Sequence, residues 1–423
     1  MIIELHMLQN FAPSCLNRDD TNAPKSCVFG GVRRARISSQ CLKRAIRLRL
    51  GAYLNGDDLS VRTKMLYERV GEILNERGRP LDEATSRTRA ALQAIKIAEK
   101  SGDDTTSPLT QYLLFVGQRE ITALAELVDK HWNELGAVAA VPAKEAAATE
   151  VAASDAPEEQ QVTSAGRKKQ GLASRRDAKN QARNALSPDL QSSVKALFNG
   201  GKAVDLALFG RMLADQPDLN REAACQVANA ISTHSVSTEM DFYTAVDDLQ
   251  TRTEHAGAGM MGIVEFNSAC YYRYANIDYR QLVANLQGDR DLARQGIAAF
   301  LRAAVEAIPT GKQNSMAAHN PPSLVFAVVR EAGAWSLANA FERPVWPVSG
   351  QHASGLIEPS IEALDAYWRH LCVAYGDRAM RAAAVCRVGD APMLHALEGY
   401  RKATVDEVFE TVLRALLTPE ATP

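Results

Sequence analysis

The amino-acid sequence predicts an α+β fold that is interrupted by a long insertion, and three observations lead to this prediction. Short runs of β-branched and aromatic residues, which are typical of strands, alternate along the chain with amphipathic segments of helical period. Apolar residues make up 46% of the 423 residues, which is enough to build a sizeable core. Between about residues 50 and 200 the pattern becomes helical and then low in complexity, with no tandem repeat.

The first predicted elements are a strand and a helix joined by a polar loop. Residues 2–8 are mostly β-branched or aliphatic and alternate in the manner of a strand. The loop contains Gly30 and Gly31, and Ser38 is placed to cap a helix over residues 39–50. Apolar residues recur in that helix at four-residue spacing and are expected in the core: Leu42, Ile46 and Leu50.

The insertion and the later elements follow in chain order. Residues 58–136 have an amphipathic helical pattern. Residues 137–190 are rich in Ala and then basic, with few apolar anchors, so this stretch is predicted to be disordered or loosely helical. The elements predicted after it are strands at 204–208, 263–274 and 323–330, helices at 220–231, 279–307, 358–374 and 405–417, and a projecting hairpin at 233–265.

Composition argues against several classes of protein. The apolar runs fall short of the roughly 18–20 residues that span a bilayer, and the N-terminal residues do not resemble a secretory signal. The seven cysteines include no C-x-x-C pair, which argues against a zinc site or a disulfide framework. We therefore expect a reduced, cytoplasmic protein that binds no membrane, metal or other cofactor.

The net charge of −2 means that binding to nucleic acid would depend on a local basic patch. Such a patch lies between Arg18 and Arg49, where the sequence has nine basic and two acidic residues. This concentration of positive charge favours an interaction with phosphates. The basic residues are Arg18, Lys25, Arg33, Arg34, Arg36, Lys43, Arg44, Arg47 and Arg49.

Residues 29–44 are the most informative part of this patch. A glycine pair lets the main chain approach a ligand, and the start of a helix offers free N–H groups to a phosphate. Ser38 and Gln40 can donate to phosphate or sugar oxygens, and Lys43 and Arg47 add charge one and two turns later. This arrangement suits binding to a nucleic-acid backbone irrespective of base identity. An amphipathic helix with a solvated basic face and a capping serine explains the same spacing.

The hairpin predicted at 233–265 differs from the basic patch in its chemistry. It contains six acidic residues and one Arg, so it is unsuited to gripping phosphates. Its aromatic end can instead wedge between bases or stack on them, although aromatic pairs more often pack in a core. The residues concerned are Phe242, Tyr243, Thr244 and Val246.

The segment 309–315 is a third candidate for contact with nucleic acid. Lys312 follows a glycine just after a predicted helix, which suits a loop that contacts phosphate. The spacing is not that of a Walker A motif, and a plain surface turn fits equally well.

Seven motifs lie in order along the chain outside roughly residues 50–200. They are PSCLNRDD (13–20), FGGVRRARISSQCLK (29–43), GRM (210–212), AISTH (230–234), FYTAVDDL (242–249), YRYANI (272–277) and SLANAFE (336–342). Together they resemble the CasC family, the backbone subunit of the type I-E CRISPR complex Cascade. Several motifs in the right order are far more specific than any one of them alone.

The resemblance implies a hand-like protein. It would have a modified RRM-like (ferredoxin-like) palm, a helical fingers insertion and a projecting β-hairpin thumb. The palm would comprise residues 1–50, 201–232 and 266–423, the fingers residues 51–200, and the thumb residues 233–265. In the family the thumb reaches onto RNA held by a neighbouring copy and displaces one base at regular intervals.

The family pattern also carries over to individual positions. Six residues match family residues that hold the backbone of the guide RNA: Arg18, Lys25, Ser38, Gln40, Lys43 and Arg47. Arg211 and Met212 match a palm loop that lies beside the RNA. Val32 departs from the family, which often has a basic residue there, so the resemblance does not imply a phosphate contact at this position. The predicted RNA contacts include three further residues, Arg34, Arg36 and Lys312.

The sequence contains no recognisable catalytic motif, so the protein is predicted not to be an enzyme. Two alternatives stay open: cleavage of target RNA by a thumb aspartate, Asp241 or Asp247, as in related type III subunits, and a stand-alone RNA-binding module. Asp247 and Asp248 are neighbours on a strand and point to opposite faces, so they can hardly share one metal ion. The expected partners are CRISPR guide RNA, target DNA through the guide, further copies of this chain, and other Cascade subunits that cap and flank the filament.

Overall fold

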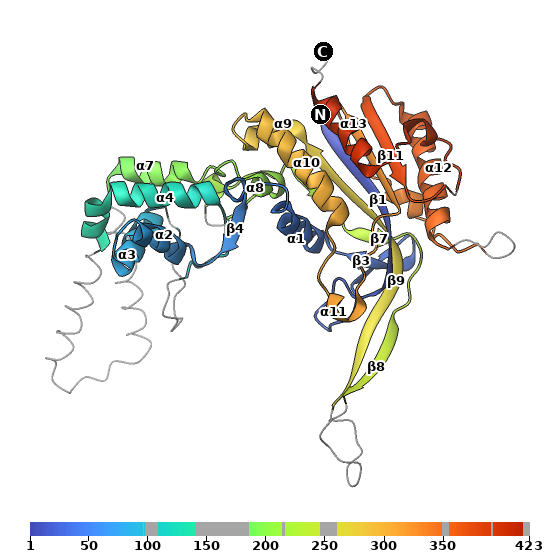
Figure 1. Ribbon diagram of the computed structural model, residues 1–423, viewed down its shortest axis with the longest axis horizontal. Coiled ribbons are helices and arrows are strands. Elements are labelled where there is room, and N and C mark those ends of the chain that lie inside the picture. The colour runs from blue at the N-terminus through green and yellow to red at the C-terminus, as the bar shows by residue number, and fades with distance from the viewer. Residues whose placement is uncertain are drawn as a thin grey trace, which may run out of the picture. The chain divides into compact units, whose positions relative to one another are not determined.

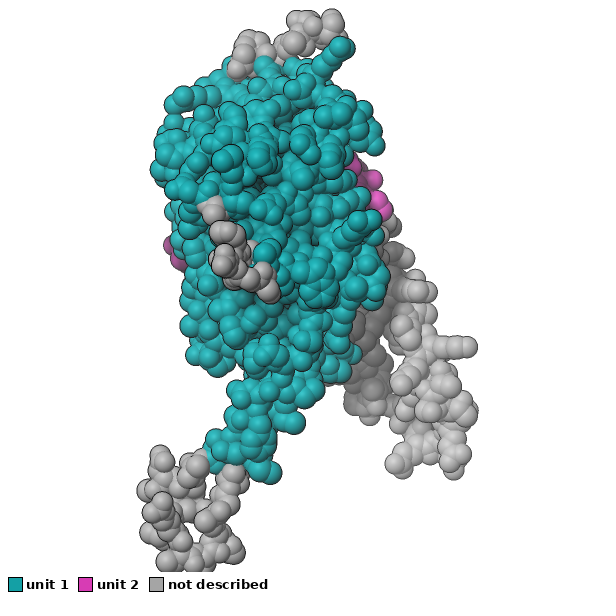
Figure 2. Space-filling view, turned by 90° about the vertical axis from the view of Figure 1, so that its right-hand side faces the viewer, with its two compact units in different colours: residues 1–54, 224–284, 289–423 teal, residues 55–223, 285–288 magenta. Residues whose placement is uncertain are grey.

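The computed structural model describes residues 1–95, 97, 109–139, 186–213, 216–245, 260–348, 355–390 and 392–417 (Figure 1). The chain divides by its internal contacts into two compact units (Figure 2). Unit 1 comprises residues 1–54, 224–284 and 289–423, and unit 2 comprises residues 55–223 and 285–288. Residues 201–223, which the sequence assigned to the palm, therefore belong to unit 2.

Unit 1 is built on a nine-stranded sheet in which every pairing is antiparallel. The strand order is β11-β10-β1-β9-β7-β3-β2, and β6 and β8 pair with β9 outside this path. This mixed architecture with an antiparallel sheet confirms the predicted α+β class. The strands are β1 (Ile2–Ser14), β2 (Ser26–Phe29), β3 (Val32–Ile37), β6 (Cys225–Val227), β7 (Ala230–Ser232), β8 (Glu239–Ala245), β9 (Met260–Asp278), β10 (Leu324–Arg330) and β11 (Met380–Arg387).

Helices cover both faces of this sheet. Successive side chains of β9 point to opposite faces, so they show which elements lie on each face. Tyr272 and Tyr274 pack in the apolar cluster that includes Trp368 of α12 (Ile357–Tyr375). Arg273 points to the other face, where its guanidinium donates to the carbonyl oxygen of Ala304 in α10 (Arg290–Glu306) at 2.7 Å. The helices α1 (Ser39–Leu50) and α13 (Val405–Leu417) pack against α10 on this second face.

The most strongly periodic elements agree with the prediction. The three helices α1, α12 and α13 lie within a residue or so of their predicted bounds. Leu42, Ile46 and Leu50 of α1 are buried, as their spacing predicts. The strand predicted at residues 2–8 is correct but continues to Ser14, with a shift of register near Phe11 where it pairs with β9.

Three predicted elements are wrong. The apolar run at 204–208 is the helix α8 (Val204–Phe209), because a short run that is buried throughout has no period to separate strand from helix. At 220–231 the structure has β6 and β7, whose pairing with β9 overrides the helix propensity of their alanines. The helix predicted at 279–307 is two helices, α9 (Tyr279–Asn285) and α10, since positive φ angles at Gln287 and Gly288 interrupt it.

Several strands were missed by sequence reasoning. The β2–β3 hairpin lies in the predicted polar loop, and β11 lies in a segment that had no predicted strand. Within the predicted disordered stretch 137–190, residues 137–139 and 188–190 are helical, and residues 140–185 lie outside the described residues. The two short strands β4 (Ser60–Thr63) and β5 (Leu114–Gly117) of unit 2 also had no counterpart in the prediction.

Unit 2 is mainly helical and has its own apolar core. Its helices bury residues at helical spacing, for example Tyr67, Val70 and Leu74 in α2. The antiparallel pair β4–β5 accompanies these helices. In the described parts of the chain no helix combines the length and the apolar character needed to cross a bilayer. The helices of unit 2 that lie wholly within the described residues are α2 (Leu66–Glu76), α3 (Leu81–Ala94), α4 (Gln118–Lys130), α7 (Pro188–Leu197) and α8.

Candidate nucleic-acid interface

The hairpin β2–β3 turns at two glycines whose conformations explain their presence. Gly30 has a φ of 59°, and a Cβ atom there would lie 1.8 Å from the carbonyl oxygen of Glu342. Gly31 has a φ of 75°, and an added Cβ atom would meet only open space. L side chains rarely adopt such angles. The turn and the approach of Glu342 are therefore sufficient to explain the pair, and the approach of a ligand to these glycines stays a prediction.

Arg34 is fully buried, which corrects its prediction as an RNA contact. Its Nη2 donates to the carbonyl oxygens of Phe341 at 2.8 Å and Glu342 at 3.2 Å. Its Nε and Nη1 donate to the carbonyl oxygens of Phe29 and Ser232, each at 3.2 Å. Burial lowers the pKa of the Arg34 guanidinium. These bonds join the hairpin to two distant segments and leave the guanidinium inaccessible to a phosphate.

The loop before β2 holds two of the predicted cations beside the start of α1. The side-chain oxygen of Asn17 accepts from the backbone N–H of Ser38 at 2.8 Å, and its carbonyl accepts from the N–H of Lys25 at 2.9 Å. Asp19 organises the turn that follows, and the hydroxyl of Thr21 lowers the pKa of the Asp19 carboxyl by donating to it. Arg18 is exposed, and Lys25 is partly exposed. Asn17 thus links the loop that carries both cations to the start of the helix.

Helix α1 begins as the sequence predicts. The hydroxyl oxygen of Ser38 accepts from the backbone N–H of Cys41 at 3.3 Å, which confirms the predicted cap. Ser38 is 6% exposed, and its hydroxyl hydrogen remains a possible donor. Gln40 is exposed, and Lys43 and Arg47 are partly exposed on the same side of the helix. These three side chains are therefore accessible from solvent.

Asn229 belongs to the site, although sequence reasoning did not single it out. Its side-chain oxygen accepts from the backbone N–H of Ser39 at 3.1 Å and from Nη1 of Arg36 at 3.3 Å. The backbone N–H of Arg36 donates to the carbonyl oxygen of Lys25 at 2.9 Å. The link between β6 and β7 thus places Arg36 beside the first turn of α1. No local pattern in the sequence brings residue 229 next to residue 39.

Lys312 lies beside the same loop as Arg18. A Cβ atom at Gly311 would lie 2.5 Å from the carbonyl oxygen of Leu16, so the two chain segments are in close contact. Burial raises the pKa of the Cys15 thiol, and the charges of Arg18 and Lys312 oppose that rise. The structure therefore brings Lys312 together with the N-terminal basic patch, and Lys312 itself is partly exposed.

Arg211 is a second correction, because it is 4% exposed in the interior of unit 2. Its Nη1 lies 3.0 Å from Oε2 of Glu120, and its Nη2 donates to the carbonyl oxygen of Phe198 at 2.7 Å. Further bonds run to the carbonyl oxygens of Phe115 and Leu219. A guanidinium with this set of partners is structural and cannot reach RNA. Its neighbour Met212 is 87% exposed.

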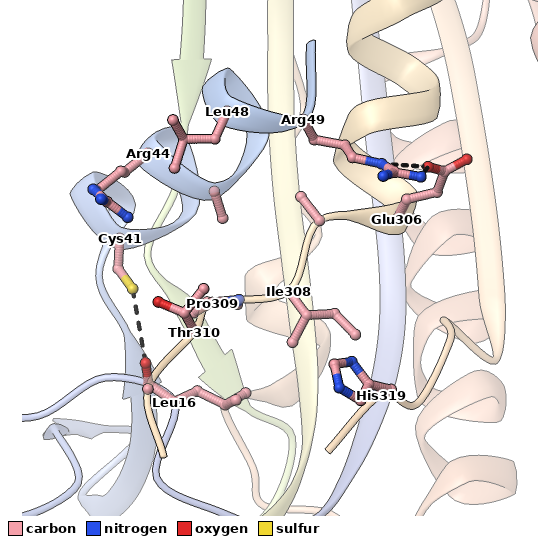
Figure 3. Close-up of a pocket in the computed structure, with 13 residues that line it drawn as sticks. Leu16, Cys41, Arg44, Leu48, Arg49, Glu306, Ile308, Pro309, Thr310 and His319 are labelled. Atoms are coloured by element: carbon pink, nitrogen blue, oxygen red, sulfur yellow. Dashed lines mark hydrogen bonds and ion pairs between the residues drawn. The ribbon is translucent and has the colours of Figure 1, made fainter. Parts of the chain in front are cut away.

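A pocket of about 390 Å³ borders another side of α1 (Figure 3). The helix contributes Arg44, Leu48 and Arg49 to its lining, and Arg49 forms an ion pair of 2.5 Å with Glu306. Gln40, Lys43 and Arg47 do not line this pocket. The residues of α1 therefore fall on three sides of the helix. One side is buried in the core, one carries Lys43 and Arg47, and one lines the pocket.

The predicted hairpin is present as a stem of β8 and the first part of β9 that extends from unit 1 (Figures 1 and 2). Phe242 pairs with Ile263 across the stem, and Thr244 pairs with Met261. Directly opposed residues share one face of a two-stranded stem. Four large apolar residues on this face are highly exposed: Met240 at 70%, Phe242 at 60%, Met261 at 67% and Ile263 at 65%.

Tyr243 lies on the opposite face of the stem from Phe242. It pairs with Gly262, and a Cβ atom there would lie 2.4 Å from Cζ of the tyrosine ring. The ring of Tyr243 therefore covers the glycine, and its side chain is less exposed, at 41%. The structure thus separates two aromatic residues that the sequence treated as one wedge. Val246 and Asp247 lie outside the described residues.

The described carboxylates and histidines do not gather into a metal site. Within that part of the chain no three His, Cys, Asp or Glu side chains form a group that could hold a metal ion. Asp241 is exposed on the stem, on the same face as Tyr243.

Comparison with known proteins gives the family of the chain. The CT1975-like protein family matches residues 3–411. One chain of a "CRISPR RNA-guided surveillance complex, pre-nicking" is 30% identical with a TM-score of 0.77, and the match covers 99% of this chain and 100% of that chain. One chain of a "CRISPR RNA-guided surveillance complex" is 25% identical with a TM-score of 0.69, covering 98% and 100%. No curated protein matches.

These matches span nearly the whole sequence, including the insertion that carries none of the seven motifs. They confirm the resemblance that those motifs indicate. The chain belongs to the CT1975-like protein family and shares its fold with subunits of CRISPR RNA-guided surveillance complexes.

Proposed function

We propose that this chain binds single-stranded CRISPR guide RNA by its sugar–phosphate backbone and lines it as a repeated, non-catalytic subunit of a type I-E Cascade. In this assignment the sheet of unit 1 is the modified RRM-like palm, unit 2 is the fingers, and the β8–β9 stem belongs to the thumb. The bases of the guide stay exposed, so that pairing with target DNA reads the sequence. Family membership and the names of the two similar complexes support this class of assembly.

One observation carries the proposal, namely that separate segments of unit 1 present cations in one region. The loop before β2, the end of β3, the start of α1 and the loop before α11 (Gln313–Met316) are joined by the contacts through Asn17, Asn229 and Gly311. The hydrogen bonds of the Asn17 and Asn229 side chains, with the close packing at Gly311, fix these segments before any ligand binds, which lowers the cost of ordering them. The accessible cations are Arg18, Lys25, Arg36, Lys43, Arg47 and Lys312.

The apolar face of the β8–β9 stem supports a second part of the proposal. Large apolar groups that stay in water on a projecting stem gain stability when a partner covers them. Nucleobases offer flat apolar surfaces of any sequence, and aromatic side chains stack on them. In the proposed filament this face, with Phe242 at its centre, enters the RNA held by the next copy and displaces a base. Tyr243 instead stiffens the stem by covering Gly262.

The proposed filament follows from a head-to-tail contact between copies. Such a contact uses two different surfaces and continues until the RNA or a capping subunit ends it. A stand-alone RNA-binding module would have no use for the projecting stem. The two cases differ in sedimentation, because a filament should grow in steps with the length of the RNA.

The proposal is tested by titrating labelled guide RNA and a scrambled RNA of equal length over a range of salt concentrations. Equal affinities and a linear fall of log K with log salt are expected, since the contacts are to phosphates. Electron microscopy of the chain co-expressed with guide RNA should show copies along the RNA. Absence of any RNA binding at low salt, with the chain alone or with its partner subunits, would overturn the proposal.

The non-catalytic role has its own test. Complexes loaded with guide RNA are incubated with matching target RNA and Mg²⁺ or Mn²⁺, and intact target is the expected result. Metal-dependent cleavage that disappears in Asp241→Asn or Asp247→Asn would instead establish the nuclease alternative.

A further inference from the structure

Trp346 differs from the other tryptophans of the described chain in its exposure. Its side chain is 64% exposed, whereas Trp368 is 1% exposed and packs in the core of unit 1. Trp335 and Trp132 are partly buried, each beneath an arginine guanidinium. A large aromatic ring left in water is a candidate for contact with a partner, although a single exposed apolar residue is not sufficient evidence.

The position of Trp346 supplies further evidence. It follows a segment that the candidate interface holds in place, since the carbonyl oxygen of Phe341 accepts from Arg34 at 2.8 Å. The backbone N–H of Val345 donates to the carbonyl oxygen of Thr233 at 2.9 Å. The backbone N–H of Val236 donates to the carbonyl oxygen of Arg33 at 3.0 Å. Three segments therefore meet here: the β2–β3 hairpin, the root of the β8–β9 stem, and residues 341–345.

The main chain around Trp346 is restrained. Pro344 fixes one φ angle before it, and Pro347 restricts Trp346 itself to extended conformations. The preceding residue Val345 is 8% exposed and anchors the segment in the core. A ring presented by a restrained segment loses little further freedom when a ligand binds to it.

Two exposed arginines at this junction suit a nucleic-acid ligand better than an apolar protein surface. Arg33 and Arg343 are exposed on two of the three segments, and the acidic residues are Glu342 and, at the root of the stem, Glu239 and Glu265. An aromatic ring with arginines nearby suits a base that stacks while its phosphate is neutralised. The β2–β3 hairpin also leads through Arg36 to the cations of the candidate interface.

We propose that Trp346 is a stacking platform for an unpaired base of the bound RNA at the root of the β8–β9 stem. The inference rests on the proposed function and adds a contact that the basic patch and the stem do not supply. Stacking tolerates any base, so this contact is independent of sequence.

Tryptophan fluorescence tests the proposal directly. Acrylamide quenching is measured for the wild-type protein and for Trp346→Phe, with and without saturating unstructured RNA. The difference between the two proteins isolates the signal of residue 346. RNA should quench this signal and shield it from acrylamide. In parallel, the anisotropy of labelled RNA measures binding without use of tryptophan.

Affinity provides the second readout. Trp346→Ala should weaken RNA binding about tenfold, and Trp346→Phe should retain most of the affinity because a smaller ring still stacks. Met393→Ala truncates another apolar side chain, 75% exposed, and should change nothing. Circular dichroism checks that each variant is folded. If Trp346→Ala does not fold, the quenching measurement on Trp346→Phe still tests the proposal.

The outcomes separate this inference from the proposed function. If labelled RNA binds while residue 346 stays equally accessible to acrylamide, the stacking platform is wrong and the proposed function stands. If no RNA binds, both are wrong. If Trp346 becomes protected with rising protein concentration in the absence of RNA, it belongs to an interface between copies, which also overturns the inference.

Discussion

Unit 1 and unit 2 each contain a motif centred on basic residues, and the two regions use the charge in different ways. In unit 2, Arg211 is 4% exposed and donates to Glu120 and to three backbone carbonyl oxygens. In unit 1, Lys43 and Arg47 of α1 keep part of their side chains in solvent. Arg211 holds loops together, whereas Lys43 and Arg47 are accessible to a ligand.

The comparison of Arg211 with Lys43 and Arg47 shows which partners stabilise a buried cation. Removing a guanidinium from water is costly unless hydrogen-bond acceptors replace its hydration, and a carboxylate among them also balances its charge. Arg211 has both, because Glu120 neutralises it and also accepts from the backbone N–H groups of Gly117 and Gly200. A cation on a helix surface needs no such set of partners. The same side chain therefore serves structure or binding according to what surrounds it in the fold.

The largest expected effect comes from Arg211→Ala. This change leaves Glu120 buried without its counter-charge and should destabilise unit 2 by about 3–5 kcal/mol. Denaturant unfolding followed by circular dichroism measures it. Arg69→Ala removes a surface ion pair with Glu72 and should have little effect. A stable Arg211→Ala protein that has lost RNA binding would break the comparison and restore Arg211 as a contact.

The adjacent pair Arg33 and Arg34 sharpens the comparison within a single strand. Arg34→Ala removes a donor from four carbonyl oxygens and should cost about 2–3 kcal/mol in the free energy of unfolding. Arg33→Ala changes an exposed side chain of β3 and should leave the unfolding free energy nearly unchanged. The same unfolding experiment tests both, and equal effects would show that burial does not separate these two residues.

The double variant Lys43→Ala with Arg47→Ala tests the exposed cations. RNA affinity should fall roughly tenfold whatever the sequence, and the slope of log K against log salt should decrease by about 1.4 if each residue contacts one phosphate. Unfolding free energy should stay the same. Arg44→Ala on the pocket side of α1 is the matched control. An unchanged salt slope would remove Lys43 and Arg47 from the interface.

The smallest effects are expected on the two faces of the stem. Phe242→Ala should spare loading of the guide RNA and impair target pairing a few-fold, because it truncates the centre of the apolar face. Tyr243→Ala uncovers Gly262 and should act more weakly, by loosening the stem. Chemical probing of target bases in loaded complexes measures the regularity of pairing. A stronger defect in Tyr243→Ala would reverse the assignment of the faces.

Local features of the sequence predicted α1 well. Its cap at Ser38 and its buried stripe depend on residues within one or two turns, so spacing alone is sufficient. The seven motifs also indicated the family. The structural roles of Arg34 and Arg211 could not be read in this way, because their partners lie far away in the chain, at Phe341 and Glu120. Asn229 was missed for the same reason, since its side chain contacts Ser39.

Strand β9 runs without interruption from Met260 to Asp278, pairing with β8 at one end and with the central strand β1 at the other. The stem is therefore continuous with the sheet, and its length depends on the number of residues in its two arms. Two residues added to each arm would lengthen it by about 7 Å and keep Phe242 on its side, since side chains alternate with period two. A single added residue in each arm would turn Phe242 to the opposite side.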